Sequence, residues 1–134
     1  ANGAAAYNHD VTIFHTFWGL NVLRQDKYIP TKKNILEKAF SKLMPRGPDR
    51  LNLSKMNMGG LGSSFIKQIM RKHNMPSLMQ LLQLAREQDV KFIACQMTVD
   101  LLGLKEEELL EGVQFAGVAT YLGVATEGSV NLFI

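Results

Sequence analysis

The sequence predicts an α/β fold whose sheet is parallel. Four segments rich in β-branched and aromatic residues have the composition of strands, namely residues 11–17, 90–94, 113–116 and 129–134. Helical patterns of apolar residues separate these segments. Strands that alternate with helices favour a parallel sheet with helices packed against it.

The first residues are typical of the end of a helix. Residues 1–6 are mostly alanine, and the polar run Asn8, His9 and Asp10 that follows Tyr7 favours a helix exit. We expect the alanines to pack closely on the sheet. The segment has no initiator methionine, so we also expect a first strand upstream of Ala1. A length of 134 residues predicts one domain over 1–134, incomplete at its amino end.

Further segments carry helix signals. Thr31 can cap a helix that ends before Pro45, and apolar residues from Leu61 to Met70 recur at helical spacing. Ser77 and Gln80 fit a capping box for the next helix. The segments KEEELLEG and GVATYLGVATEG predict a short acidic helix and a last helix packed tightly on the sheet.

The stretch between the first two strands holds three helical segments instead of one crossover helix. The excess lies at about residues 18–62 and predicts an insertion after the strand at 11–17. In open α/β sheets, ligand sites form at the carboxyl ends of the strands. The insertion is therefore expected beside a site.

Composition limits the class of protein. The single cysteine excludes an intramolecular disulfide and favours a reducing, cytoplasmic setting. The chain has no apolar run of about 18 residues, so no membrane span is expected. The formal net charge of +3 is too small to indicate a nucleic-acid partner.

The charge is unevenly distributed. Residues 21–58 hold nine Lys or Arg and three acids, a net of +6, whereas residues 96–134 hold one Lys and six acids, a net of −5. Such a chain can associate with itself or bind an oppositely charged partner. Solvated helix faces explain the same pattern without any partner.

Cys95 stands where the strand at 90–94 meets a helix. The positive end of a helix dipole and its free N–H groups lower the pKa of a thiol and favour the nucleophilic thiolate. The alternative is a small buried hydrophobic residue, a common role of cysteine. The absence of a second cysteine excludes a CxxC redox couple within the chain.

Two other segments have both a chemical and a structural interpretation. His15, on the first strand, could pair with Cys95 or be a structural histidine. The glycine-rich turn NMGGLGSS, residues 57–64, could bind an anion before a helix or act as a hinge. The three histidines and one cysteine show no metal-ligand spacing, so no metal is expected.

Apolar residues also gather near the predicted insertion. Trp18 and Gly19 follow the first strand and suit a pocket wall or a hydrophobic anchor. Six of the seven methionines lie between residues 44 and 79. They could fill the core, or form an adaptable surface over the site or at a subunit contact.

Several quoted segments occur together in a known family. The ordered set TIFHTFWGLNVLR, KMNMGGLG, FIACQMTVDLLG, GVATYLG and VNLFI resembles the DsrE/DsrF-like sulfur-transfer family, in its longer branch labelled peroxiredoxin-like. The resemblance spans the whole chain. It implies a flavodoxin-like three-layer sandwich with a parallel sheet of about five strands. Nothing in the residues supports the peroxiredoxin label, because CxxC and a resolving cysteine are absent.

The resemblance also implies a function. Cys95 would accept sulfane sulfur as a persulfide and pass it to a partner thiol, with no metal or cofactor. Rhodanese or TusA-like carriers, which in some members are fused in the same polypeptide, are the implied partners, and homo-oligomers are expected. We expect a pocket around Cys95 lined by His15, Trp18, Gly19, Met56, Met58, Gly59, Gly60, Gln96, Met97 and Tyr121. Alternatives are a non-enzymatic oligomeric scaffold, or a nucleotide or flavin binder that uses the glycine-rich turn.

Overall fold

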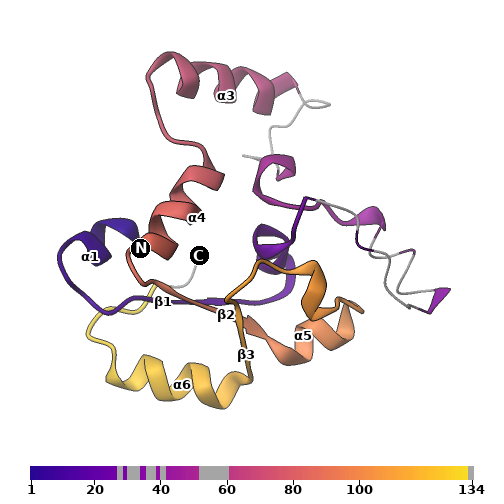
Figure 1. The fold of residues 1–134 in the computed structure, drawn as a ribbon, viewed down its shortest axis with the longest axis vertical. Coiled ribbons are helices and arrows are strands. Elements are labelled where there is room, and N and C mark those ends of the chain that lie inside the picture. The colour runs from indigo at the N-terminus through magenta and orange to yellow at the C-terminus, as the bar shows by residue number, and fades with distance from the viewer. Residues whose placement is uncertain (27–28, 30–33, 36–38, 40–41, 52–60, 133–134) are drawn as a thin grey trace.

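The sheet has three parallel strands in the described part of the chain. The structure is a computed structural model and describes residues 1–26, 29, 34–35, 39, 42–51 and 61–132. Strands β1 (Thr12–His15), β2 (Lys91–Cys95) and β3 (Gln114–Ala116) lie in the order β1-β2-β3. Each pair is parallel, as Figure 1 shows. The predicted α/β class with a parallel sheet is confirmed and is consistent with a flavodoxin-like fold.

The strand predicted at residues 129–134 is not found at 129–132, and residues 133–134 lie outside the described residues. Asn131 explains the difference. Its side-chain amide donates to the carbonyl oxygens of Ala125 at 2.9 Å and Gly128 at 3.3 Å. These bonds turn residues 129–132 back onto the end of the preceding helix, and no strand forms there.

Five α-helices and three short 3-10 helices are described. The α-helices are α1 (Asn2–Ala6), α3 (Leu61–Lys72), α4 (Leu78–Glu87), α5 (Gln96–Leu101) and α6 (Val118–Glu127). The 3-10 helices are η1 (Phe17–Leu23), η2 (Pro48–Arg50) and η4 (Glu106–Glu108). The predicted acidic helix is thus a single 3-10 turn. The helix predicted from Thr31 lies largely outside the described residues.

Two predicted helix ends are confirmed. The Gln80 N–H donates to the Ser77 hydroxyl at 3.2 Å, and the Ser77 N–H donates to the Gln80 side chain at 2.8 Å. This capping box satisfies two backbone donors at the start of α4. At the other end of the chain, α1 ends before Asn8, whose positive φ of 59° stops the helix.

The hydrophobic core lies on one face of the sheet. Leu82 and Ala85 of α4 are buried against Phe92 and Ala94 of β2, together with residues of η1 and of the segment after α5. Burying one leucine side chain stabilises the fold by roughly 2 kcal/mol. In Figure 1, α1, α4 and η1 lie on this side of the sheet and α6 lies on the other.

The opposite face is covered less tightly than predicted. Helix α6 contacts the sheet through Tyr121, whose ring centroid lies 5.3 Å from that of Phe14. No residue of α6 is buried. The tight packing predicted for this helix is therefore wrong for a single chain, although the helix itself is confirmed.

Helix α3 extends away from the sheet (Figure 1). Its predicted helical stripe is present, but Phe65, Ile66 and Ile69 are exposed to solvent. None of the helices in the described part of the chain is long and apolar enough to cross a bilayer.

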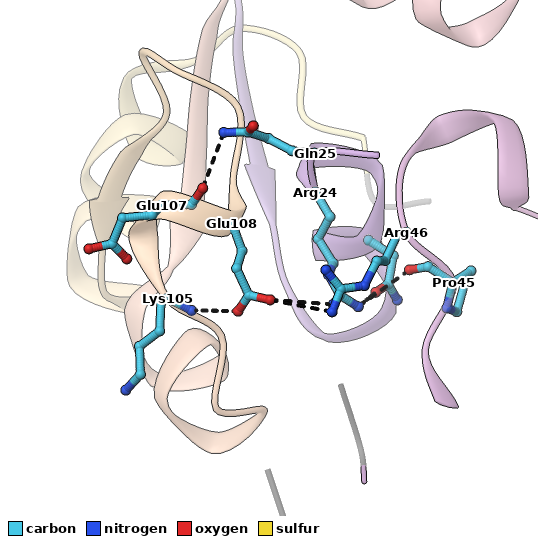
Figure 2. Close-up of polar contacts among 8 residues, drawn as sticks. Arg24, Gln25, Pro45, Arg46, Lys105, Glu107 and Glu108 are labelled. Carbon is cyan, nitrogen blue, oxygen red and sulfur yellow. Dashed lines mark hydrogen bonds and ion pairs between the residues drawn. The ribbon is translucent and has the colours of Figure 1, made fainter. Parts of the chain in front are cut away.

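A buried ion cluster joins the segment after β1 to the segment after α5 (Figure 2). The Glu108 carboxylate lies 3.8 Å from the Arg24 guanidinium and 3.6 Å from that of Arg46. Arg24 also donates to the Asn21 side-chain oxygen at 3.4 Å and to the Pro45 carbonyl at 3.5 Å. The cluster fixes the far end of η1 relative to η4.

Candidate functional site: the Cys95 thiol

Cys95 is the last residue of β2 and the N-cap of α5. Its backbone is extended (φ −66°, ψ 111°), so the chain changes from strand to helix at this residue. The side chain is 7% exposed. The predicted strand-to-helix junction at the thiol is therefore confirmed.

Opposing effects act on the pKa of the Cys95 thiol. Burial raises this pKa, because desolvation disfavours the charged thiolate. Hydrogen bonding from the Thr98 hydroxyl and N–H, the Thr16 hydroxyl and the Met97 N–H lowers it. The hydrogen-bonding groups together outweigh burial, so the pKa lies below its ordinary value. The thiolate, which is the nucleophilic form, is therefore favoured.

Thr16 and Thr98 bring two distant segments together at the thiol. Their hydroxyl oxygens lie 3.0 Å apart, although the residues are 82 positions apart in the sequence. Thr16 follows β1 and Thr98 lies in the first turn of α5. Because each hydroxyl can accept from one neighbour while it donates to another, the pair can bond to each other and to the sulfur.

The sequence profile of the DsrE/DsrF/DrsH-like family matches residues 1–133. The chain belongs to this family. A Bacillus subtilis relative, the uncharacterized protein YrkE, is 62% identical over 134 residues, which cover 100% of this chain and 84% of YrkE. The sulfur carrier protein DsrE2 of Allochromatium vinosum is 35% identical over 141 residues, covering 100% of this chain and 85% of DsrE2. These findings support a sulfur-transfer role at the level of the family.

Of the residues predicted around Cys95, those nearest in sequence lie beside it. Gln96 and Met97 form the first turn of α5, and the Gln96 amide donates to the Asp100 carboxylate at 3.0 Å. Met97 is 70% exposed. Tyr121 lies over Phe14 on the same face of the sheet as Cys95, since Phe14 and Cys95 both alternate with core-facing neighbours.

Trp18 and Gly19 lie in η1, directly after Thr16. Trp18 is 62% exposed, and its carbonyl accepts a hydrogen bond of 3.0 Å from the Asn21 side chain. Phe17 has a φ of +44°, a conformation that is strained for an aromatic residue. The strained residue lies next to Thr16, where the chain leaves β1 and enters η1.

His15 lies on the other face of the sheet. In the β1–β2 register it is opposite Ala94, one residue before Cys95, and its ring centroid is 5.9 Å from that of Phe92 in the core. Successive strand residues point to opposite faces, so the imidazole points away from the thiol's face. Burial lowers the pKa of His15, and its Nδ1 has no hydrogen-bond partner. This placement favours the structural role for His15.

The remaining predicted residues, Met56, Met58, Gly59 and Gly60, lie outside the described residues. Within the described part, no group of three or more His, Cys, Asp or Glu side chains is arranged to hold a metal ion. Sequence reasoning missed Thr16 and Thr98. The spacing Cys-x-x-Thr at a helix start was the available signal for Thr98, because the residue three positions after an N-cap faces that cap.

Proposed function

We propose that this chain carries sulfane sulfur as a persulfide on Cys95 and passes it to the thiol of a partner protein. The observation that supports this most directly is the position of the buried thiol at the β2–α5 junction, beside the paired hydroxyls of Thr16 and Thr98 that lower its pKa. A structural cysteine needs no groups that favour its charged form. The family membership and the relative named as a sulfur carrier agree with the proposal.

The transfer proceeds by two displacements at sulfur. The Cys95 thiolate attacks the outer sulfur of a donor persulfide, the donor's S–S bond breaks, and the donor leaves as a thiolate. The outer sulfur keeps its proton in this step, so the negative charge leaves with the donor. Between transfers the Cys95 persulfide can lose that proton to water and hold the charge on its outer sulfur, and it regains the proton before the acceptor attacks. An acceptor thiolate then attacks that outer sulfur and releases the Cys95 thiolate, so no net oxidation or reduction occurs.

The groups around the sulfur have defined roles in this scheme. The N–H groups of Met97 and Thr98 lie at the start of α5, where the helix holds them in place, and they favour the charged form of the thiol. The hydroxyls of Thr16 and Thr98 can rotate, so they can follow the charge from the sulfur of Cys95 toward the outer sulfur. Rhodanese or TusA-like carriers are the proposed donor and acceptor, and the reducing cytoplasm is the proposed setting.

Intact mass spectrometry tests the proposal. The full chain is incubated with polysulfide, thiosulfate or a persulfidated rhodanese, and the Cys95→Ser variant is treated in the same way as the control. We expect a mass gain of one sulfur atom that reductant removes and that Cys95→Ser lacks. The proposal is wrong if no donor adds sulfur to the folded chain while Cys95 in the same sample is alkylated after unfolding.

A further inference from the structure

A cavity lies at the amino end of the sheet, at the opposite edge from Cys95. Its walls come from the end of α4, the first residues of β2 and residues 110–114, which run into β3. Cys95 is the last residue of β2, so the length of that strand separates the cavity from the thiol. The proposed sulfur transfer therefore makes no use of this cavity.

The floor of the cavity is apolar. Buried side chains of the core line it, namely Leu82 of α4, Phe92 of β2 and Leu23 at the end of η1. The Leu110 N–H donates to the Leu23 carbonyl at 2.8 Å, which fixes two of the walls relative to each other. The volume is about 210 Å³, below the roughly 300–1,000 Å³ of pockets that take drug-sized ligands. A space of this size suits a small molecule with a compact apolar group.

Two cations and two acids line the same cavity, namely Arg86, Lys91, Asp89 and Glu111. All four are exposed to solvent, so the charged groups lie at the mouth and the apolar side chains lie deeper. Among these four described residues no ion pair forms, although opposite charges line one space. A ligand that carries one charge of each sign can therefore bind groups that do not pair with one another.

The Arg86 guanidinium reaches from α4 to the opposite wall of the cavity. A Cβ atom at Gly112 would lie 3.8 Å from Arg86 Nη2. Gly112 has a φ of +82°, a conformation that glycine adopts without strain. Because this position has no side chain, the guanidinium stays accessible from the cavity. Its planar fork of N–H donors matches both oxygens of a carboxylate.

We propose that this cavity binds a small α-amino acid with an apolar side chain. Such a ligand has its two charges at one end and its side chain at the other, which matches a charged mouth above an apolar floor. Its carboxylate binds the Arg86 guanidinium, and Lys91 adds positive charge beside it. Its ammonium group binds the acids Asp89 and Glu111, and its side chain fills the floor. The proposal does not depend on sulfur transfer by Cys95.

Titration of the isotope-labelled full chain, followed by nuclear magnetic resonance, tests the ligand class. The probes are L-leucine, L-methionine and L-phenylalanine, and we expect at least one to shift the amide signals of residues 89–92 and 110–114. The tightest probe is then compared with its analogues that lack the amino group or the carboxyl group, and with glycine, which lacks the side chain. Each analogue loses one charged or apolar contact, so each should bind at least about tenfold more weakly.

The titrations also give results that overturn the proposal. One is the absence of shifts at these residues with all three amino acids at millimolar concentration. Another is an analogue without the amino group that binds as tightly as the amino acid, because the cavity would then be a site for simple anions. Equal binding of the analogue without the carboxyl group contradicts the role of Arg86 in the same way.

Matched variants test the assigned residues. Arg86→Gln removes the partner of the ligand's carboxylate, and Arg71→Gln on α3 is the control because Arg71 does not line the cavity. Asp89→Asn with Glu111→Gln removes both acids, and asparagine tolerates the positive φ of 58° at residue 89. We expect Arg86→Gln and the double variant each to weaken binding by about tenfold or more, and Arg71→Gln to leave it unchanged. Circular dichroism checks that all variants fold. Unchanged affinity in a folded Arg86→Gln variant, or in the folded double variant, contradicts the proposal.

Discussion

Replacing Thr98 by valine tests the origin of the lowered pKa at Cys95. Valine has nearly the shape of threonine, so the buried volume is kept while the hydroxyl is lost. The hydroxyl and N–H of Thr98 both favour the Cys95 thiolate, and the substitution removes only the hydroxyl. A hydrogen bond to a charged group is worth about 1.5–3 kcal/mol. Losing a bond of this size should raise the pKa of Cys95 and slow its alkylation at neutral pH by about tenfold or more.

The pH dependence of alkylation by iodoacetamide measures this pKa, with the ultraviolet absorbance of the thiolate as a second readout. Thr98→Ser is the matched control, because serine keeps the hydroxyl and should leave the pKa near that of the wild type. Thr98→Val also leaves the Thr16 hydroxyl without its 3.0 Å partner. That loss should destabilise the fold by about 1–3 kcal/mol, and urea unfolding measures it separately. An unchanged pKa in a folded Thr98→Val variant would refute the reasoning.

Three further predictions concern stability. Burial holds the pKa of His15 below its usual 6.5, so the unfolded chain binds the proton more readily than the folded chain. The free energy of unfolding should therefore be highest above pH 6.5 and fall as the pH drops below it. In urea titrations, His15→Phe should flatten this pH dependence. Glu108→Gln leaves two arginines without their shared carboxylate and should cost about 3–5 kcal/mol, whereas the exposed control Glu106→Gln should change the free energy of unfolding by less than about 0.5 kcal/mol. Ser77→Ala removes the side-chain cap of α4 and should lower the free energy of unfolding by about 1 kcal/mol, whereas Ser77→Asp should keep most of the capping contribution. Equal melting temperatures for the wild type and Ser77→Ala would contradict this.

Local signals were sufficient to predict much of the fold. The strands at β1, β2 and β3 were placed by their β-branched and aromatic composition, and the capping box at Ser77 was read from two residues. The position of Cys95 followed in the same way, because a strand followed at once by a helix has a junction residue. These features depend on neighbours in sequence, so a single sequence carries them.

Features that depend on particular side-chain contacts were missed. The composition of residues 129–134 favours a strand, but Asn131 bonds back to the end of α6, and residues 129–132 form no strand. The sequence could not show that Thr16 meets Thr98, since 82 positions separate them. The sequence also could not show which apolar helix faces are exposed to solvent, because α3 has the same periodicity whether its apolar face is buried or exposed.

The separation of Thr16 and Thr98 bears on how the protein folds. β2, α5, β3 and α6 follow one another closely, so their contacts close short loops. Contacts of β1 with β2 close a loop about four times longer, which costs about 1.2 kcal/mol more in chain entropy. We therefore expect β1 to pair with β2 late in folding. Because Thr16 directly follows β1, its hydroxyl reaches Cys95 only when that pairing forms. A thiol of low pKa would then report that the last step of folding has been completed.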